Sequence, residues 1–227
     1  MLRIRFIQLT YIRLCGLLLA VIGWVLCVIA TGADEWRVWH SKDVPGTSPA
    51  KIWVGIWRVC FVDHPPEGEP TRQCQEFLEQ HQSLPTEILI AQDLMPFAIV
   101  VLSLALVCMF FALWNVFRNA RPEKVFLTFF RVGGVLILMS AFIIFIPLMW
   151  NIYSVMVNER IVFPGDFSLP ALPNEQTVGF PIYVGFFASG FQVTIVHSVN
   201  PVQSRYCALS ALIFWDIWLC TRSLRPF

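Results

Sequence analysis

Four long stretches of this chain contain no Asp, Glu, Lys or Arg: residues 14–33, 94–117, 132–158 and 177–204. A helix of about 20 apolar residues is long enough to cross the ~30 Å hydrocarbon core of a bilayer. The whole 227-residue chain is 57% hydrophobic and only 14% charged, which exceeds what one soluble core needs. The pattern therefore predicts an integral membrane protein that is mainly α-helical and has four spans.

We expect a single domain over residues 1–227. The predicted spans are residues 12–33, 94–117, 132–152 and 179–199. They leave two outer segments, 34–93 and 153–178, a cytoplasmic loop at 118–131 and a cytoplasmic or interfacial tail at 200–227. The first span lacks a small-x-small cleavage site and is predicted to be retained, with a removed signal peptide as the alternative.

The basic residues predict the orientation. Ten of the 16 Lys and Arg lie before residue 14, between the second and third spans, or after the fourth. Acidic residues outnumber basic ones ten to five in residues 34–93, and three to one in residues 151–178. Because basic residues favour the cytoplasmic side, we expect both termini in the cytoplasm and both acidic segments outside. A net charge of only +1 indicates no preference for nucleic acid.

The first outer segment has two strand-like patterns. Residues 36–40 alternate in polarity, and residues 51–62 are rich in Trp, Ile, Val and Phe. Both patterns predict β-strands, separated by a turn-rich stretch around Pro45 and Pro49. Since two strands alone are marginally stable in water, we expect further pairing, for example with the second outer segment.

Of the seven cysteines, only Cys60 and Cys74 fall in a predicted outer segment. In an oxidising compartment such a pair predicts a disulfide, which would contribute about 3 kcal/mol by closing this loop. The alternative is a zinc site, for which His64 and His81 are available. Zinc needs four ligands at close spacing, and these residues match no recognised spacing.

A set of aromatic, glycine and cysteine positions resembles the signature of the claudin family, within the wider superfamily of claudins, peripheral myelin proteins and epithelial membrane proteins. The signature is a tryptophan, a Gly-Leu-Trp triplet and two cysteines, matched here by Trp36, Gly55, Ile56, Trp57, Cys60 and Cys74. Further similar segments extend the resemblance over about residues 10–195.

The resemblance implies a left-handed bundle of four transmembrane helices that carries a small extracellular antiparallel β-sheet, mostly from the first outer segment. Indole rings prefer the boundary between water and hydrocarbon, which suits Trp36 and Trp57 as anchors of that sheet. Claudins polymerise in cis and meet claudins of the adjacent cell in trans at tight junctions of the plasma membrane. The implied function is cell adhesion with a paracellular barrier or ion selectivity, and the implied partners are this chain itself, other claudins and the lipid bilayer.

Claudin positions also suggest contact residues. Phe77 and Leu78 are candidates for docking on a neighbour in cis, with packing on their own sheet as the alternative. The candidates for contact in trans are Phe163, Phe167 and Leu169, and those for charge selectivity are Asp63 and Glu76.

The tail departs from the claudin pattern. Residues 206–220 predict an interfacial segment, with Cys207 and Cys220 as candidate palmitoylation sites. Claudins end in a hydrophobic dipeptide that scaffold domains recognise by strand addition, whereas this chain ends in Pro226 and Phe227. Proline lacks the backbone donor, which argues against scaffold binding.

No enzyme is predicted. The sequence has no glycine-rich phosphate loop, redox cysteine pair, metal-ligand cluster or nucleophile with an identifiable base, so we expect no cofactor. Two alternatives to junctional adhesion stay open: an auxiliary subunit or regulator of a membrane channel or receptor, and a tetraspan of the myelin or epithelial-membrane-protein type without a junctional role.

Overall fold

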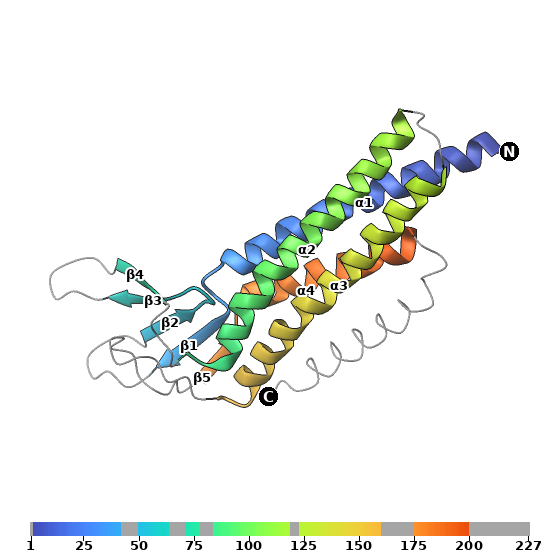
Figure 1. The fold of residues 1–227 in the computed structure, drawn as a ribbon. Coiled ribbons are helices and arrows are strands. Elements are labelled where there is room, and N and C mark those ends of the chain that lie inside the picture. The colour runs from blue at the N-terminus through green and yellow to red at the C-terminus, as the bar shows by residue number, and fades with distance from the viewer. Residues whose placement is uncertain are drawn as a thin grey trace. The chain divides into compact units, whose positions relative to one another are not determined.

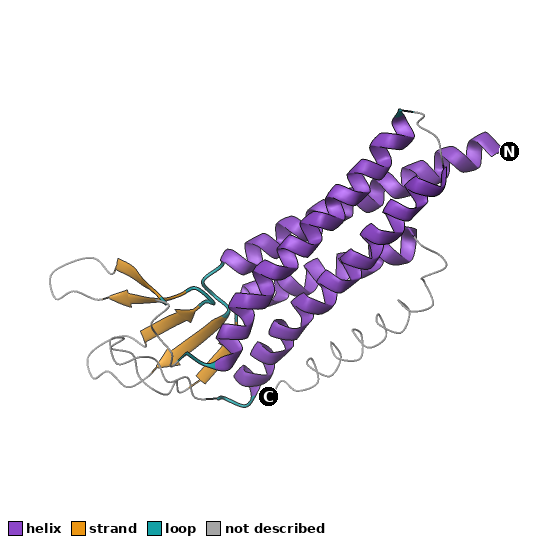
Figure 2. Cartoon of the chain, in the orientation of Figure 1, coloured by secondary structure: helices purple, strands orange, loops and turns teal. Residues whose placement is uncertain are grey.

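The computed structural model describes residues 2–41, 50–63, 71–77, 84–118, 123–159 and 175–199. Its side chains are described for residues 13–40, 51–62, 71–77, 84–118, 127–159 and 175–194. These ranges contain four helices and five strands (Figures 1 and 2). The helices are α1 (Leu2–Gly32), α2 (Thr86–Phe117), α3 (Glu123–Met156) and α4 (Phe180–Val199). The strands are β1 (Arg37–Ser41), β2 (Ala50–Val54), β3 (Arg58–Asp63), β4 (Thr71–Glu76) and β5 (Glu175–Val178).

Among the described residues, three helical segments are long and apolar enough to span a membrane: Arg13–Gly32, Thr86–Phe117 and Leu127–Met156. The 20-residue helix α4 lies where the sequence predicts a fourth span. Together with the sheet, these segments make the chain an α-helical membrane protein with a small β-sheet. The predicted span boundaries themselves stay predictions.

The ends of α2 and α3 follow from local chemistry. Helix α2 begins directly after Pro85 and carries Glu87 in its first turn, where a negative side chain complements the helix dipole. Beyond the last residue of α3, Asn158 adopts a left-handed conformation with φ of 52°. Asparagine tolerates this conformation better than most residues, and the amide of Glu159 then bonds the carbonyl of Ser154 at 3.0 Å.

All five strands form one antiparallel sheet in the order β4-β3-β2-β1-β5 (Figure 1). The edge strand β5 follows α3 in the chain and pairs with β1, so the expected pairing with the second outer segment is present. The prediction of one strand over residues 51–62 is wrong, because the chain turns at Gly55 and divides this stretch into β2 and β3. The Gly55 amide donates to the Arg58 carbonyl at 2.9 Å and closes that turn.

The chain divides into two compact units. The first unit comprises Met1–Val25, Ala98–Phe142 and Phe187–Phe227. Its described core is apolar and comes from α1, α2 and α3, with Ala20, Leu102, Met109, Phe130 and Ile137 among the buried members. Trp24 donates its indole N–H to the hydroxyl of Ser103 at 2.9 Å and links α1 to α2 within this unit.

The second unit comprises Leu26–Phe97 and Ile143–Phe186, and it contains the whole sheet. One sheet face buries Trp39, Ile52, Val54 and Val59 together with Ile88 of α2. Because successive side chains of a strand point to opposite faces, the other face of the sheet is free to carry polar groups.

Candidate functional site

Two tryptophans bond the sheet region to the end of α1. The indole N–H of Trp36 donates to the carbonyl of Ala30 at 2.8 Å, and that of Trp57 donates to the carbonyl of Thr31 at 2.9 Å. The last carbonyls of a helix have no partner inside the helix. The two indoles satisfy two of them, and the bonds fix the sheet to α1.

The turn between β2 and β3 is bonded to α2. The side-chain amide of Gln92 donates to the carbonyl of Ile56 at 2.6 Å. A Cβ at Gly55 would lie 2.9 Å from the Cα of Asp34, closer than real Cβ contacts. The turn therefore needs glycine because it packs directly on the backbone that leads into β1.

A second close approach of two backbone segments occurs at Gly179, which lies between β5 and α4 in the chain. The amide of Gly179 donates to the carbonyl of Trp36 at 2.9 Å. A Cβ at this position would lie 1.4 Å from the carbonyl oxygen of Glu35, which excludes every other residue without a backbone shift.

A buried ionic network joins β1 to α2 and α3. The guanidinium of Arg37 donates to Asn151 Oδ1 at 2.7 and 3.0 Å, to Ser154 Oγ at 3.0 Å and to Glu87 Oε1 at 3.3 Å. Ser154 Oγ in turn donates to the same oxygen of Glu87 at 2.8 Å. Burial lowers the pKa of Arg37, and the neighbouring carboxylate of Glu87 opposes that shift. The network orients the sheet on the ends of two helices.

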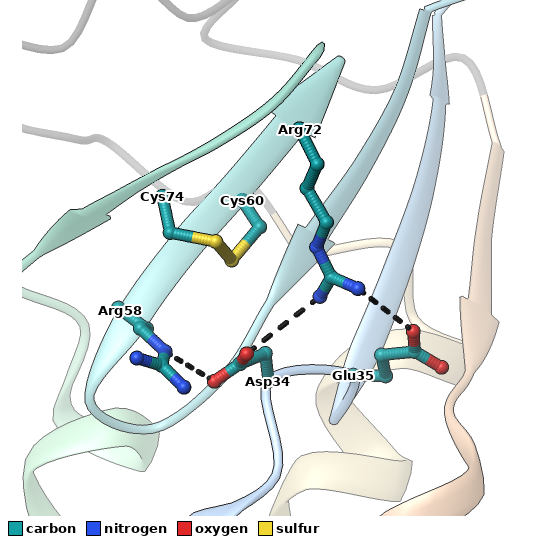
Figure 3. The surroundings of a disulfide bond; sticks show 6 residues. All are labelled: Asp34, Glu35, Arg58, Cys60, Arg72 and Cys74. Carbon is teal, nitrogen blue, oxygen red and sulfur yellow. Dashed lines mark hydrogen bonds and ion pairs between the residues drawn. A yellow bond between two sulfur atoms is a disulfide. The ribbon is translucent and has the colours of Figure 1, made fainter.

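The other sheet face carries the disulfide between Cys60 and Cys74 (Figure 3). These cysteines are direct partners in the pairing of β3 with β4, and Trp53 of β2 is opposite Cys60. Arg58 forms an ion pair with Asp34, and this hydrogen bond raises the pKa of Arg58. Arg72 lies between Asp34 and Glu35, with N–O distances of 3.6 and 3.8 Å.

The zinc alternative finds no support at the cysteines. Asp34, Cys60 and Cys74 place their ligand atoms within 4.8 Å of one another. Both sulfurs are bonded to each other, and a cysteine binds zinc only as a free thiolate. The candidate ligands His64 and His81 lie outside the described residues.

The sequence matches the family described as PMP-22/EMP/MP20/Claudin tight junction over residues 21–194. The chain belongs to this family. Its relatives include human claudin-3, which is 25% identical over 204 residues that cover 87% of this chain and 86% of claudin-3. Human claudin-4 is 23% identical over 181 residues, with coverage of 79% and 80%, and mouse claudin-5 is 27% identical over 182 residues, with coverage of 78% and 76%. At these identities the chain is a divergent relative of the claudins.

The structure places several of the predicted residues of this claudin-family chain. Trp36 and Ile56 are fully buried, whereas Trp57 is 42% exposed beside the end of α1. Phe77 packs against the apolar cluster of its own sheet, so its role in cis contact stays a prediction. Glu76 is exposed at the end of β4. The other candidates lie outside the described residues or have no described side chain: Asp63, Leu78, Phe163, Phe167, Leu169, Cys207 and Cys220.

Two groups of residues were missed by the sequence analysis of this claudin-family chain. The first is the network of Arg37, Glu87, Asn151 and Ser154. Asn151 and Ser154 are three residues apart, a spacing that puts two polar side chains on one face of the helix, and this signal at the end of the third span could have found them. The second group is Arg72 with its carboxylates, whose proximity depends on strand pairing and leaves no local signal.

Proposed function

We propose that this chain is a cell–cell adhesion protein of the tight-junction type, which polymerises in the plasma membrane and contributes to a paracellular barrier or to its ion selectivity. Its helices form a left-handed four-span bundle, both termini lie in the cytoplasm and the sheet is extracellular. The partners are further copies of this chain and other claudins, in cis and in trans. We propose no catalytic role.

The observation that carries this proposal is the rigid attachment of the sheet to the helices, in a chain of the claudin family. Hydrogen bonds from two indoles attach the sheet to α1, and a hydrogen bond from Gln92 attaches it to α2. The hydrogen bonds of Arg37 attach it to α2 and α3. An adhesive surface must keep a fixed orientation so that lateral copies align, because each mobile attachment adds an ordering cost to assembly.

The test is expression of the chain, with a tag at its N-terminus, in cells that lack tight-junction strands. We expect freeze-fracture images to show continuous strands at cell contacts, and transepithelial resistance to change. We expect a Gly179→Ala variant to form no strands, because its Cβ would overlap the carbonyl of Glu35. A Gly190→Ala variant is the matched control and should form strands, since a Cβ at Gly190 meets no atom within 4 Å. Surface labelling separates loss of strands from loss of delivery.

A uniform surface distribution of the unmodified chain without strands would contradict autonomous polymerisation. Co-purification with a larger membrane protein would then support the auxiliary-subunit alternative. Redistribution of vesicles or membrane without enrichment at contacts would support a tetraspan role of the myelin or epithelial type.

A further inference from the structure

The last turns of α2 carry an aromatic column that ends in a cation. Phe110 and Trp114 stack with their ring centres 6.1 Å apart, and the guanidinium carbon of Arg118 lies 5.0 Å from the ring centre of Trp114. The amide of Arg118 donates to the carbonyl of Trp114 at 3.1 Å, so the helical path continues to Arg118. Because residues four apart are neighbours on one face of a helix, the three side chains form one column along α2.

A hollow of about 360 Å³ lies beside this column and is lined by Phe110, Phe111 and Trp114. The three rings are about half-exposed. Phe111 also contacts Phe129 of α3 edge to face, with the ring centres 5.0 Å apart. Since α2 is long and apolar enough to span a membrane, half-exposed rings on this helix face hydrocarbon. An apolar chain can therefore fill the hollow.

The charge around the end of α2 is positive. Residues 118–131 contain four basic residues and one acidic residue. Arg118 is exposed, and none of the ion pairs among the described residues includes it. The stack on Trp114 uses the face of the planar guanidinium and leaves its N–H groups able to donate. The end of a helix contributes only about half a negative charge, so the full charge of Arg118 prevails and attracts an anion.

A ligand that matches both the cation and the hollow has an anionic head and an apolar chain. Trp114 places the column at the boundary between hydrocarbon and headgroups, because indole rings favour that boundary. In the orientation proposed above, this end of α2 faces the cytoplasm, and the cytoplasmic leaflet contains the anionic phospholipids.

We propose that the end of α2 is a binding site for one anionic phospholipid. Its phosphate accepts hydrogen bonds from Arg118, and one of its acyl chains lies in the hollow formed by Phe110, Phe111 and Trp114. This inference goes beyond the proposed function, because it concerns the lipid around one helix and needs no contact between copies of the chain.

The first experiment titrates the purified full-length protein in detergent with phosphatidylserine or phosphatidylcholine and counts the bound lipids by native mass spectrometry. We expect the unmodified chain to bind phosphatidylserine about fivefold more tightly, the scale of one basic residue beside an anionic headgroup. R118Q should lose this preference. R131Q is the matched control and should keep it. Arg131 is also exposed, but it follows Phe129 by two residues and lies about 200° around α3 from the ring that contacts Phe111.

Two tryptophan substitutions test the hollow. W114L should weaken the binding of both lipids severalfold, because it removes part of the lining and the ring on which Arg118 stacks. W150L is the matched control, since Trp150 of α3 is another half-exposed tryptophan, and it should leave both affinities unchanged. Leucine keeps each helix apolar, so both variants should fold.

Three results would overturn the inference. Equal effects of R118Q and R131Q would mean that net charge alone explains the preference. Unchanged affinities in W114L would mean that no acyl chain occupies the hollow. Displacement of the lipid by glycerophosphoserine, the same headgroup without acyl chains, at equal concentration would mean that the site takes a soluble phosphate. Because these measurements use purified protein, failure of this inference is distinguishable from failure to form strands at cell contacts.

Discussion

Arg37 of β1 and Glu87 of α2 form an ion pair that is almost completely buried. The N–O distance is 3.3 Å, and the two side chains are 1% and 7% exposed. Asn151 and Ser154 complete the hydrogen bonding of the guanidinium. Because a buried ion loses its hydration, each member of such a pair depends on the other to remain in the interior.

We therefore expect Arg37→Met to destabilise the protein by about 3–5 kcal/mol, since it leaves the charge of Glu87 buried without its counter-ion. Thermal unfolding in detergent measures the loss. Arg58→Met is the control, because its ion pair with Asp34 is half-exposed and such pairs contribute about 1 kcal/mol or less. Equal losses in the two variants would contradict the distinction between a buried and a superficial pair.

The two indole bonds to α1 predict unequal effects of the same chemical change. Trp36→Phe and Trp57→Phe each remove one N–H donor from a terminal carbonyl of α1. Trp36 is 1% exposed and Trp57 is 42% exposed, so water can replace the lost donor more easily at Trp57. We expect a loss of about 1–3 kcal/mol for Trp36→Phe and less than about 1 kcal/mol for Trp57→Phe. Chemical unfolding of the purified variants measures both, and the reverse order would contradict the assigned roles.

Gly179 and Gly32 offer a matched pair of glycine substitutions. A methyl group at Gly179 would overlap the carbonyl of Glu35, whereas one at Gly32 meets no atom within 4 Å. We expect Gly179→Ala to be retained inside the cell and to unfold at a lower temperature, because the bond from its amide to Trp36 cannot form without a backbone shift. Gly32→Ala should reach the surface normally. Surface biotinylation measures delivery, and normal delivery of both variants would contradict the close approach.

The sequence predicted the features that depend on composition over long stretches. Stretches without charges predicted the helices, because a membrane span needs apolar length more than any particular residue. The disulfide between Cys60 and Cys74 was predicted correctly, because these are the two cysteines in the predicted outer segments. The turn at Gly55 was missed, since Ile56 and Trp57 favour strands and the turn depends on contacts with Asp34 and Gln92.

The missed polar residues share one physical cause. Arg37 bonds residues that are 50, 114 and 117 positions away in the chain, so no local pattern reveals its burial. A charge count treats Arg72 and Glu35 as independent, although strand pairing brings them together. The net charge of one face of a sheet can therefore be predicted only when the register of its strands is known.

Gln192 of α4 provides the last prediction, within the helical unit that contains Ala20 and Ile137. Its side chain is fully buried, and within the described part of the chain neither its nitrogen nor its oxygen has a hydrogen-bond partner. A Cβ at Gly23 of α1 would lie 3.5 Å from Gln192 Cγ, so the amide packs beside a residue without a side chain. An unsatisfied buried amide costs about 1–3 kcal/mol.

We expect Gln192→Leu to raise the stability of the protein by about 1–2 kcal/mol, because leucine fills a similar volume without a polar group. Ser140→Ala is the matched control of opposite sign, since the buried hydroxyl of Ser140 donates to the carbonyl of Ala98 at 3.1 Å. Thermal unfolding in detergent compares the two variants. A lower midpoint for Gln192→Leu would mean that the amide is hydrogen-bonded in the folded protein and stabilises it.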